Sequence, residues 1–293
     1  MASTDTRVED LLNSLVGCAF LVTLVETGIA PEDLEDPKVS LRLAASAADL
    51  VDRFHMDYNM IAAELPALAR EKAAQARAVV EHPGTAWWFD DIDLKAQAWL
   101  SIHGTLTKFI YGTPPYTSAW RRPENPSRGW ARYAQKPYGN QVTSTQYGPL
   151  LTSQLIAYDE RVGDHLCEFP LAWWSIRILE EVRVYEIHGP SDWHSLCVGY
   201  PAIGTDDDRL VPNWGAVAQE WDGVHLSLGG LLTAEQHRYE SPVGWTMLDF
   251  WYAEQTYWLR ALETETERQP DFDRGMGTPQ IEGLRLPDLG KRP

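Results

Sequence analysis

A change of character at Pro83 constrains the fold of this chain more than any other feature. Before Pro83, apolar residues recur at spacings of three and four, which is typical of amphipathic helices. After it, Gly, Pro and aromatic residues become frequent, and the apolar runs shorten to the length of strands. We therefore predict an α+β protein with an N-terminal helical region (residues 1–83), a mainly antiparallel domain (84–262) and a polar C-terminal tail (263–293).

Three helices are expected in the first region. The first contains the periodic residues from Val8 to Ala19 and ends at Gly28, the second follows Pro37, and the third spans 67–80 after Pro66. The apolar run 15–25 has only eleven residues, whereas about twenty are needed to cross a bilayer, so we interpret it as a buried helix. Because small helices bury too little area alone, we expect this region to pack on the following domain.

The second region shows strand-length segments separated by turn residues. The predicted strands are 96–102, 141–145, 172–178, 182–187, 223–228 and 256–259, and the predicted helices are 191–200 and 213–221. Strands and helices do not alternate regularly, which favours antiparallel pairing over a parallel α/β sheet. The residues after Leu262 are polar and then rich in Pro and Gly, so they are interpreted as a poorly ordered tail or a surface arm.

Charge and composition narrow the possible partners. With 25 basic and 42 acidic residues the net charge is −17, which disfavours nucleic acids and anionic membranes and leaves a small-molecule ligand. Three cysteines without CxxC spacing and an acidic start without a signal peptide fit a reducing cytoplasm. Thirteen Trp and twelve Tyr favour either an aromatic-lined pocket or an aromatic core.

One segment couples a cationic turn to a strand of hydroxyl side chains. Lys136-Pro137 and Gly139-Asn140 are turn residues, and the Thr-Ser-Thr run centred on Ser144 follows them. Five basic residues lie in the sixteen positions that end at Lys136, and guanidinium groups match phosphate oxygens. The cluster fits either a pyrophosphate-binding loop or a solvated loop.

The hydroxyl strand resembles the Ser-Thr-Ser element of the ADP-ribosyltransferase fold, over residues 84–262. That resemblance implies a split-sheet domain with NAD bound between the sheets as a substrate. It makes His103 and Gly104 of the His-Gly-Thr run contacts to ribose and nicotinamide. It also implies that Arg132 or Lys136 meets the pyrophosphate, that Tyr133 or Tyr147 stacks on nicotinamide, and that Ser144 orients the site.

The same resemblance makes Glu254 the catalytic acid, because an oriented carboxylate stabilises the sugar cation left by departing nicotinamide. The chain departs from the arginine-modifying pattern, which has Gln or Glu two residues earlier, where this sequence has Tyr252. A surface carboxylate beside an aromatic strand is the plainer interpretation of Glu254.

Acidic runs at 90–93 and 206–208 are interpreted as solvated turns, so no metal site is expected. The absence of GxGxxG, P-loop, GxSxG and HExxH motifs argues against Rossmann cofactors, P-loop NTPases, common serine hydrolases and zincins.

The favoured hypothesis is an NAD-consuming ADP-ribosyltransferase or NAD glycohydrolase. Two alternatives stay open: a small-molecule enzyme with a Trp/Tyr-lined pocket and no NAD, and a non-catalytic interaction protein. The acceptor and the oligomeric state are left open by the sequence.

Overall fold

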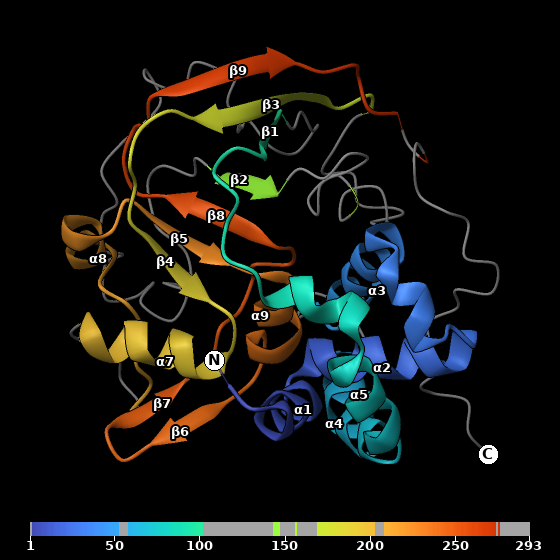
Figure 1. Cartoon of the computed structure of the whole chain (residues 1–293). Helices are drawn as coiled ribbons and strands as arrows, with labels where there is room; N and C mark the ends of the chain where they lie inside the picture. The colour runs from blue at the N-terminus through green and yellow to red at the C-terminus, as the bar shows by residue number, and fades with distance from the viewer. Residues whose placement is uncertain are drawn as a thin grey trace.

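The computed structural model describes residues 2–52, 58–101, 143–146, 156, 169–202, 208–273 and 275. It is an α+β protein in which N-terminal helices precede a mostly antiparallel sheet with interspersed helices (Figure 1). The N-terminal elements are α1 (Thr4–Asn13), α2 (Leu15–Thr27), η1 (Pro31–Glu35), α3 (Pro37–Leu50), α4 (Tyr58–Arg70), α5 (Ala73–Glu81) and η2 (Pro83–Phe89).

Residues at the helix ends show where the first helices begin and end. The predicted first helix is divided at Ser14, whose hydroxyl accepts from the Gly17 backbone N–H and donates to the Glu235 carbonyl oxygen at 2.7 Å. Gly28 ends α2 in the left-handed region, with φ 71°, as expected of a glycine after a helix. The third predicted helix was misplaced: Pro66 lies inside α4, and the chain turns at residues 71–72 instead.

The second region contributes nine strands and three helices among the described residues. They are β1 (Gln97–Ser101), β2 (Thr143–Gln146), β3 (Ala172–Ile178), β4 (Val184–Ile187), α7 (Pro190–Gly199), α8 (Trp214–Glu220), β5 (Gly223–Leu226), α9 (Leu228–Ala234), β6 (Tyr239–Ser241), β7 (Gly244–Thr246), β8 (Gln255–Trp258) and β9 (Thr264–Arg268).

Seven strands form one sheet in the order β4-β5-β8-β2-β1-β3-β9, and β6 and β7 form a separate hairpin. All neighbours in the large sheet are antiparallel except β4 and β5. Among the described residues, the group β9-β3-β1 meets the group β2-β8-β5-β4 through two residue pairs, Gln97 with Gln146 and Ala98 with Thr145. The expectation of a mainly antiparallel α+β domain is therefore confirmed.

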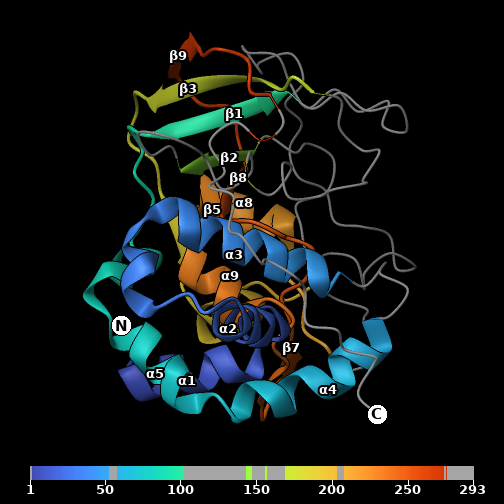
Figure 2. The same ribbon diagram turned by 90° about the vertical axis from the view of Figure 1, so that its right-hand side faces the viewer.

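Helix α9 connects the two regions. It packs against α1, α2 and α3, and Figure 2 shows α2 and α3 lying alongside it. One hydrophobic core runs through this contact, because buried residues of α1–α3 and of β4, β5 and α9 belong to the same cluster. The N-terminal helices thus pack on the sheet region, as their apolar faces require.

Many of the aromatic side chains are buried, most of them in this core and Trp258 in a second cluster with Trp99, Ile176 and Ile178. Five tryptophans are among the largest fully buried side chains: Trp88, Trp193, Trp214, Trp251 and Trp258. Helix α2 is buried as well, which accounts for its apolar run. Among the described helices, none is by itself long and apolar enough to span a membrane; α1 and α2 together meet that length and composition but are bent by 94°.

Several elements of the second region differ from the sequence prediction. The hairpin of β6 and β7 was not predicted, and β4 begins at Val184 instead of residue 182. The predicted strand 223–228 ends at Leu226, because Ser227 caps α9, which was not expected. Helix α7 begins at Pro190 with Gly189 as its N-cap, not at Ser191, in agreement with the preference of proline for the first helical turn. Residues 264–268, assigned to the polar tail, form the edge strand β9 along β3, where Arg177 and Glu265 form an ion pair.

Candidate functional site

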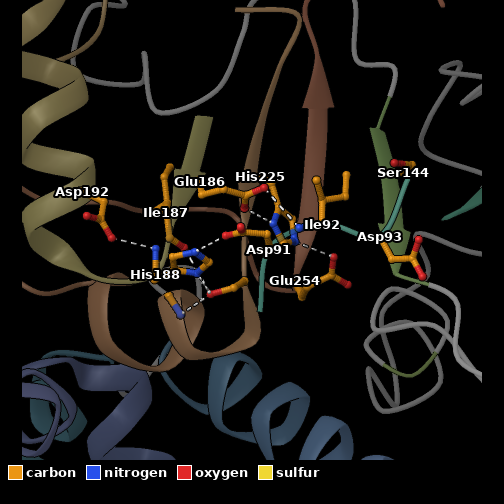
Figure 3. Close-up of polar contacts among 12 residues, drawn as sticks. Asp91, Ile92, Asp93, Ser144, Glu186, Ile187, His188, Asp192, His225 and Glu254 are labelled. Atoms are coloured by element: carbon orange, nitrogen blue, oxygen red, sulfur yellow. Dashed lines mark hydrogen bonds and ion pairs between the residues drawn. The ribbon is translucent and has the colours of Figure 1, made fainter. Parts of the chain in front are cut away.

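The most unusual group of side chains is a chain of Glu186, His225 and Glu254 at the end of the sheet formed by β4, β5 and β8 (Figure 3). The Nδ1 atom of His225 lies 2.5 Å from Oε2 of Glu186, and its Nε2 atom lies 3.2 Å from Oε1 of Glu254. The side chains of His225 and Glu254 are 1% and 4% exposed, whereas that of Glu186 is 19% exposed. One imidazole therefore bridges two carboxylates inside the protein.

The sheet register brings these residues together. Glu186 of β4 is the direct partner of His225 of β5, and His225 is the partner of Thr256 of β8. Glu254 comes two residues before Thr256, so it lies diagonally across from His225. The contact is thus determined by strand pairing between segments far apart in the sequence.

The electrostatics of this chain favour a charged imidazolium. Burial alone lowers the pKa of His225, but the hydrogen bonds and charges of Glu186 and Glu254 outweigh it and raise the pKa to about 9. At neutral pH the three residues then comprise one cation between two carboxylates, with a net charge of −1.

A row of hydroxyl side chains continues from His225 across the sheet. Thr256 and Ser144 are fully buried and are partners in the pairing of β8 with β2. Ser144 Oγ donates to Gln97 Oε1 at 2.6 Å and accepts from Trp258 Nε1 at 2.9 Å. Thr256 Oγ1 is buried without a hydrogen-bond partner in the described structure. A buried hydroxyl of this kind is available to a water molecule or a ligand.

The backbone that precedes Glu254 is strained. Phe250 and Tyr252 have φ angles of 69° and 63°, in the left-handed region that bulky residues rarely adopt. The Trp251 backbone N–H donates to Glu235 Oε1 at 3.1 Å, which holds this turn in place. Each such residue costs on the order of 1–3 kcal/mol, and strain of this kind is concentrated at functional sites.

A small pocket reaches Glu254 from the helical side. The space between its walls is about 170 Å³, including the part that is open to solvent, and the walls consist mostly of aliphatic side chains of α3 and α9. The lining residues include Leu41, Ala45, Leu231, Tyr252 and Glu254. It contains a single aromatic ring, so the aromatic-lined pocket considered from composition does not occur at this place.

A second group of polar side chains adjoins Glu186. Asp91 Oδ1 lies 3.0 Å from His188 Nε2, and the Ile92 backbone N–H donates to Glu186 Oε1 at 3.1 Å. The other ring nitrogen of His188, Nδ1, lies 3.0 Å from Ser227 Oγ. Asp91, which the sequence suggested to be part of a solvated turn, is exposed but makes this specific contact.

Of the residues predicted from sequence, Glu254 and Ser144 belong to the described structure. Both are buried, in or beside neighbouring strands, and Ser144 is held by Gln97 and Trp258. The predicted cofactor-binding residues lie outside the described residues: His103, Gly104, Arg132, Tyr133, Lys136 and Tyr147. The interpretation of Glu254 as a surface carboxylate is wrong, since its residue is 3% exposed.

Sequence reasoning missed Glu186 and His225. A local signal existed, because each lies within a short strand, Val-Tyr-Glu-Ile and Gly-Val-His-Leu, where an ionisable residue interrupts apolar neighbours. Such a residue in a buried strand requires a partner. The pairing of the two strands, however, is not encoded locally.

Comparison of the chain with protein-family models, curated proteins and solved structures finds no match.

Proposed function

We propose that the chain is an enzyme that cleaves the glycosidic bond between the ribose and the nicotinamide of NAD, so that nicotinamide leaves as a neutral molecule and Glu254 stabilises the positive charge left on the sugar. The observation that carries this proposal is the buried Glu186–His225–Glu254 chain, in which two carboxylates share one imidazole. The choice of NAD rests on the resemblance of the Thr-Ser-Thr strand to the ADP-ribosyltransferase element.

The sign of the charge supports this class of reaction. A net negative, largely water-excluded group stabilises positive charge that develops in a transition state and opposes a developing oxyanion. Acyl transfer through an oxyanion is therefore disfavoured at Glu254. Loss of nicotinamide from NAD leaves a positively charged sugar, which is the charge that such a carboxylate favours.

His225 has a positioning role in this proposal. Its hydrogen bond fixes one oxygen of Glu254, and the opposite nitrogen is held by Glu186, so the carboxylate is oriented before substrate arrives. The strained turn at Phe250 and Tyr252 fixes the backbone on the other side.

The test is Glu254→Gln, which preserves size and removes charge. Nicotinamide release from NAD should fall by at least about 100-fold, or about 2.7 kcal/mol of transition-state stabilisation, while affinity for NAD persists. The matched control is Glu240→Gln, an exposed residue of β6 that pairs with Arg238 and should leave release unchanged.

Nicotinamide is measured by chromatography, and NAD binding by calorimetry. The proposal fails if the wild-type protein neither binds NAD nor releases nicotinamide. It also fails if Glu254→Gln and Glu240→Gln have equal rates, because Glu254 would then have no part in the chemistry.

A further inference from the structure

We propose that Asp91, Glu186 and His188 form a binding site for one divalent transition-metal ion. The site shares Glu186 with the Glu186–His225–Glu254 chain, but it rests on the spacing of three ligand atoms and does not require the glycosidic reaction. The residues come from the loop before β1, from β4 and from the residue directly after β4.

The spacing of the ligand atoms fits an ion. One atom from each residue, a carboxylate oxygen or a ring nitrogen, lies within 4.8 Å of the other two. The shortest measured separation is 3.0 Å, from Asp91 Oδ1 to His188 Nε2. With metal–ligand bonds of about 2.0–2.2 Å, adjacent ligand atoms lie about 3–3.5 Å apart, so this pair already has the required spacing.

The outer side of the His188 ring is also held in place. Its nitrogen Nδ1 lies 3.0 Å from Ser227 Oγ, and the same hydroxyl oxygen accepts from the Gly230 backbone N–H at the start of α9. This contact leaves Nε2, which lies 3.0 Å from Asp91 Oδ1, as the ring atom on the side of the carboxylates.

Neighbouring contacts hold two of the three ligands, Glu186 and His188. The His188 backbone N–H donates to Asp192 Oδ2 at 2.9 Å, and Glu186 accepts from both Ile92 and His225. Hydrogen bonds of this type to the far side of ligating groups are typical of metal centres and orient the ligands. The combination of one imidazole with two carboxylates favours Zn²⁺, Mn²⁺ or Fe²⁺ over ions that prefer thiolates.

The experiment titrates chelator-treated full-length protein with ZnCl₂ and MnCl₂ in a calorimeter. We expect one equivalent to bind, and we expect His188→Gln and Asp91→Asn each to weaken binding by at least about 30-fold. Asp93→Asn is the matched control: it lies on the same loop, and Figure 3 draws its side chain well apart from Glu186 and His188. Binding to this variant should equal that to the wild type.

Two further measurements separate the site from its alternatives. Co²⁺ should give visible d–d absorption in the wild-type protein that disappears in His188→Gln, which reports an imidazole ligand directly. Melting of the metal-free variants shows that they fold. The proposal is overturned if the wild type binds no equivalent of metal, if His188→Gln and Asp91→Asn bind like the wild type, or if NMR shows His188 doubly protonated at pH 7.5 with Zn²⁺ present.

Discussion

Replacing His225 by Gln tests how much the charged contacts of His225 with Glu186 and Glu254 stabilise the protein. The substitution keeps a polar side chain but removes the positive charge between Glu186 and Glu254. Because the Glu254 side chain is only 4% exposed, its carboxylate would be left buried without a compensating cation. Removing one partner of a buried ion pair typically costs about 3–5 kcal/mol, so His225→Gln should lower the free energy of unfolding by that amount at pH 6.

The pH dependence of the free energy of unfolding gives the contribution of the His225 charge by a second route. The pKa of His225 is about 9 in the folded protein, against an ordinary value near 6.5, and the folded state therefore favours the charged form. The resulting stabilisation is fully present below pH 6.5 and is lost as the pH rises through 9. The difference of about 2.5 in pKa corresponds to roughly 3 kcal/mol.

Urea denaturation in metal-free buffer at intervals from pH 6 to pH 10 measures both effects. The difference in unfolding free energy between the wild type and His225→Gln should shrink across this range. The double variant with Glu254→Gln should recover part of the loss, because it removes the unpaired carboxylate. A difference that stays constant from pH 6 to pH 10, or a double variant no more stable than His225→Gln, would refute the reasoning.

Two further predictions concern residues around the site. Gly230→Ala places a Cβ atom 2.1 Å from the Ile187 carbonyl oxygen, so it should lower the free energy of unfolding by about 3 kcal/mol. Gly199→Ala in α7 meets no atom within 4 Å, so it should raise the free energy of unfolding by about 0.5 kcal/mol. Both are measured by urea denaturation, and equal unfolding midpoints of the two variants would contradict this prediction. Asp10 has its pKa raised to about 6 by burial and by the neighbouring carboxylates, so its ionisation costs stability as the pH rises from 4 to 6. Asp10→Asn should therefore be about 1–3 kcal/mol more stable than the wild type at pH 7 but not at pH 4, and thermal melting that shows no gain at pH 7 would disprove it.

The elements that the sequence predicted well are those with a local cause. Strand β3 has the predicted bounds, 172–178, because apolar and aromatic residues fill it between turn residues. Helix α8 begins after Asn213, whose side chain accepts from the Ala216 backbone N–H as an N-cap does. In both cases neighbouring residues alone determine the structure.

Elements whose cause is distant were missed. Strand β9 is composed of Thr, Glu and Arg residues that resemble a solvated tail, and it is a strand because β3 offers an edge to pair with. Helix α9 is seven residues long and too short to show a period; packing on both sides stabilises it. His225 likewise contacts its two carboxylates only because β4 and β8 pair with β5 on either side.

Helix α9 also links the N-terminal helices to the candidate site. Its N-cap, Ser227, contacts His188, and its C-cap, Glu235, accepts from Trp251 in the strained turn before Glu254. The hydroxyl of Ser14, between α1 and α2, donates to the carbonyl oxygen of the same Glu235. A displacement of α1 or α2 would therefore act on the C-terminal end of α9, and through Glu235 on the turn that precedes Glu254.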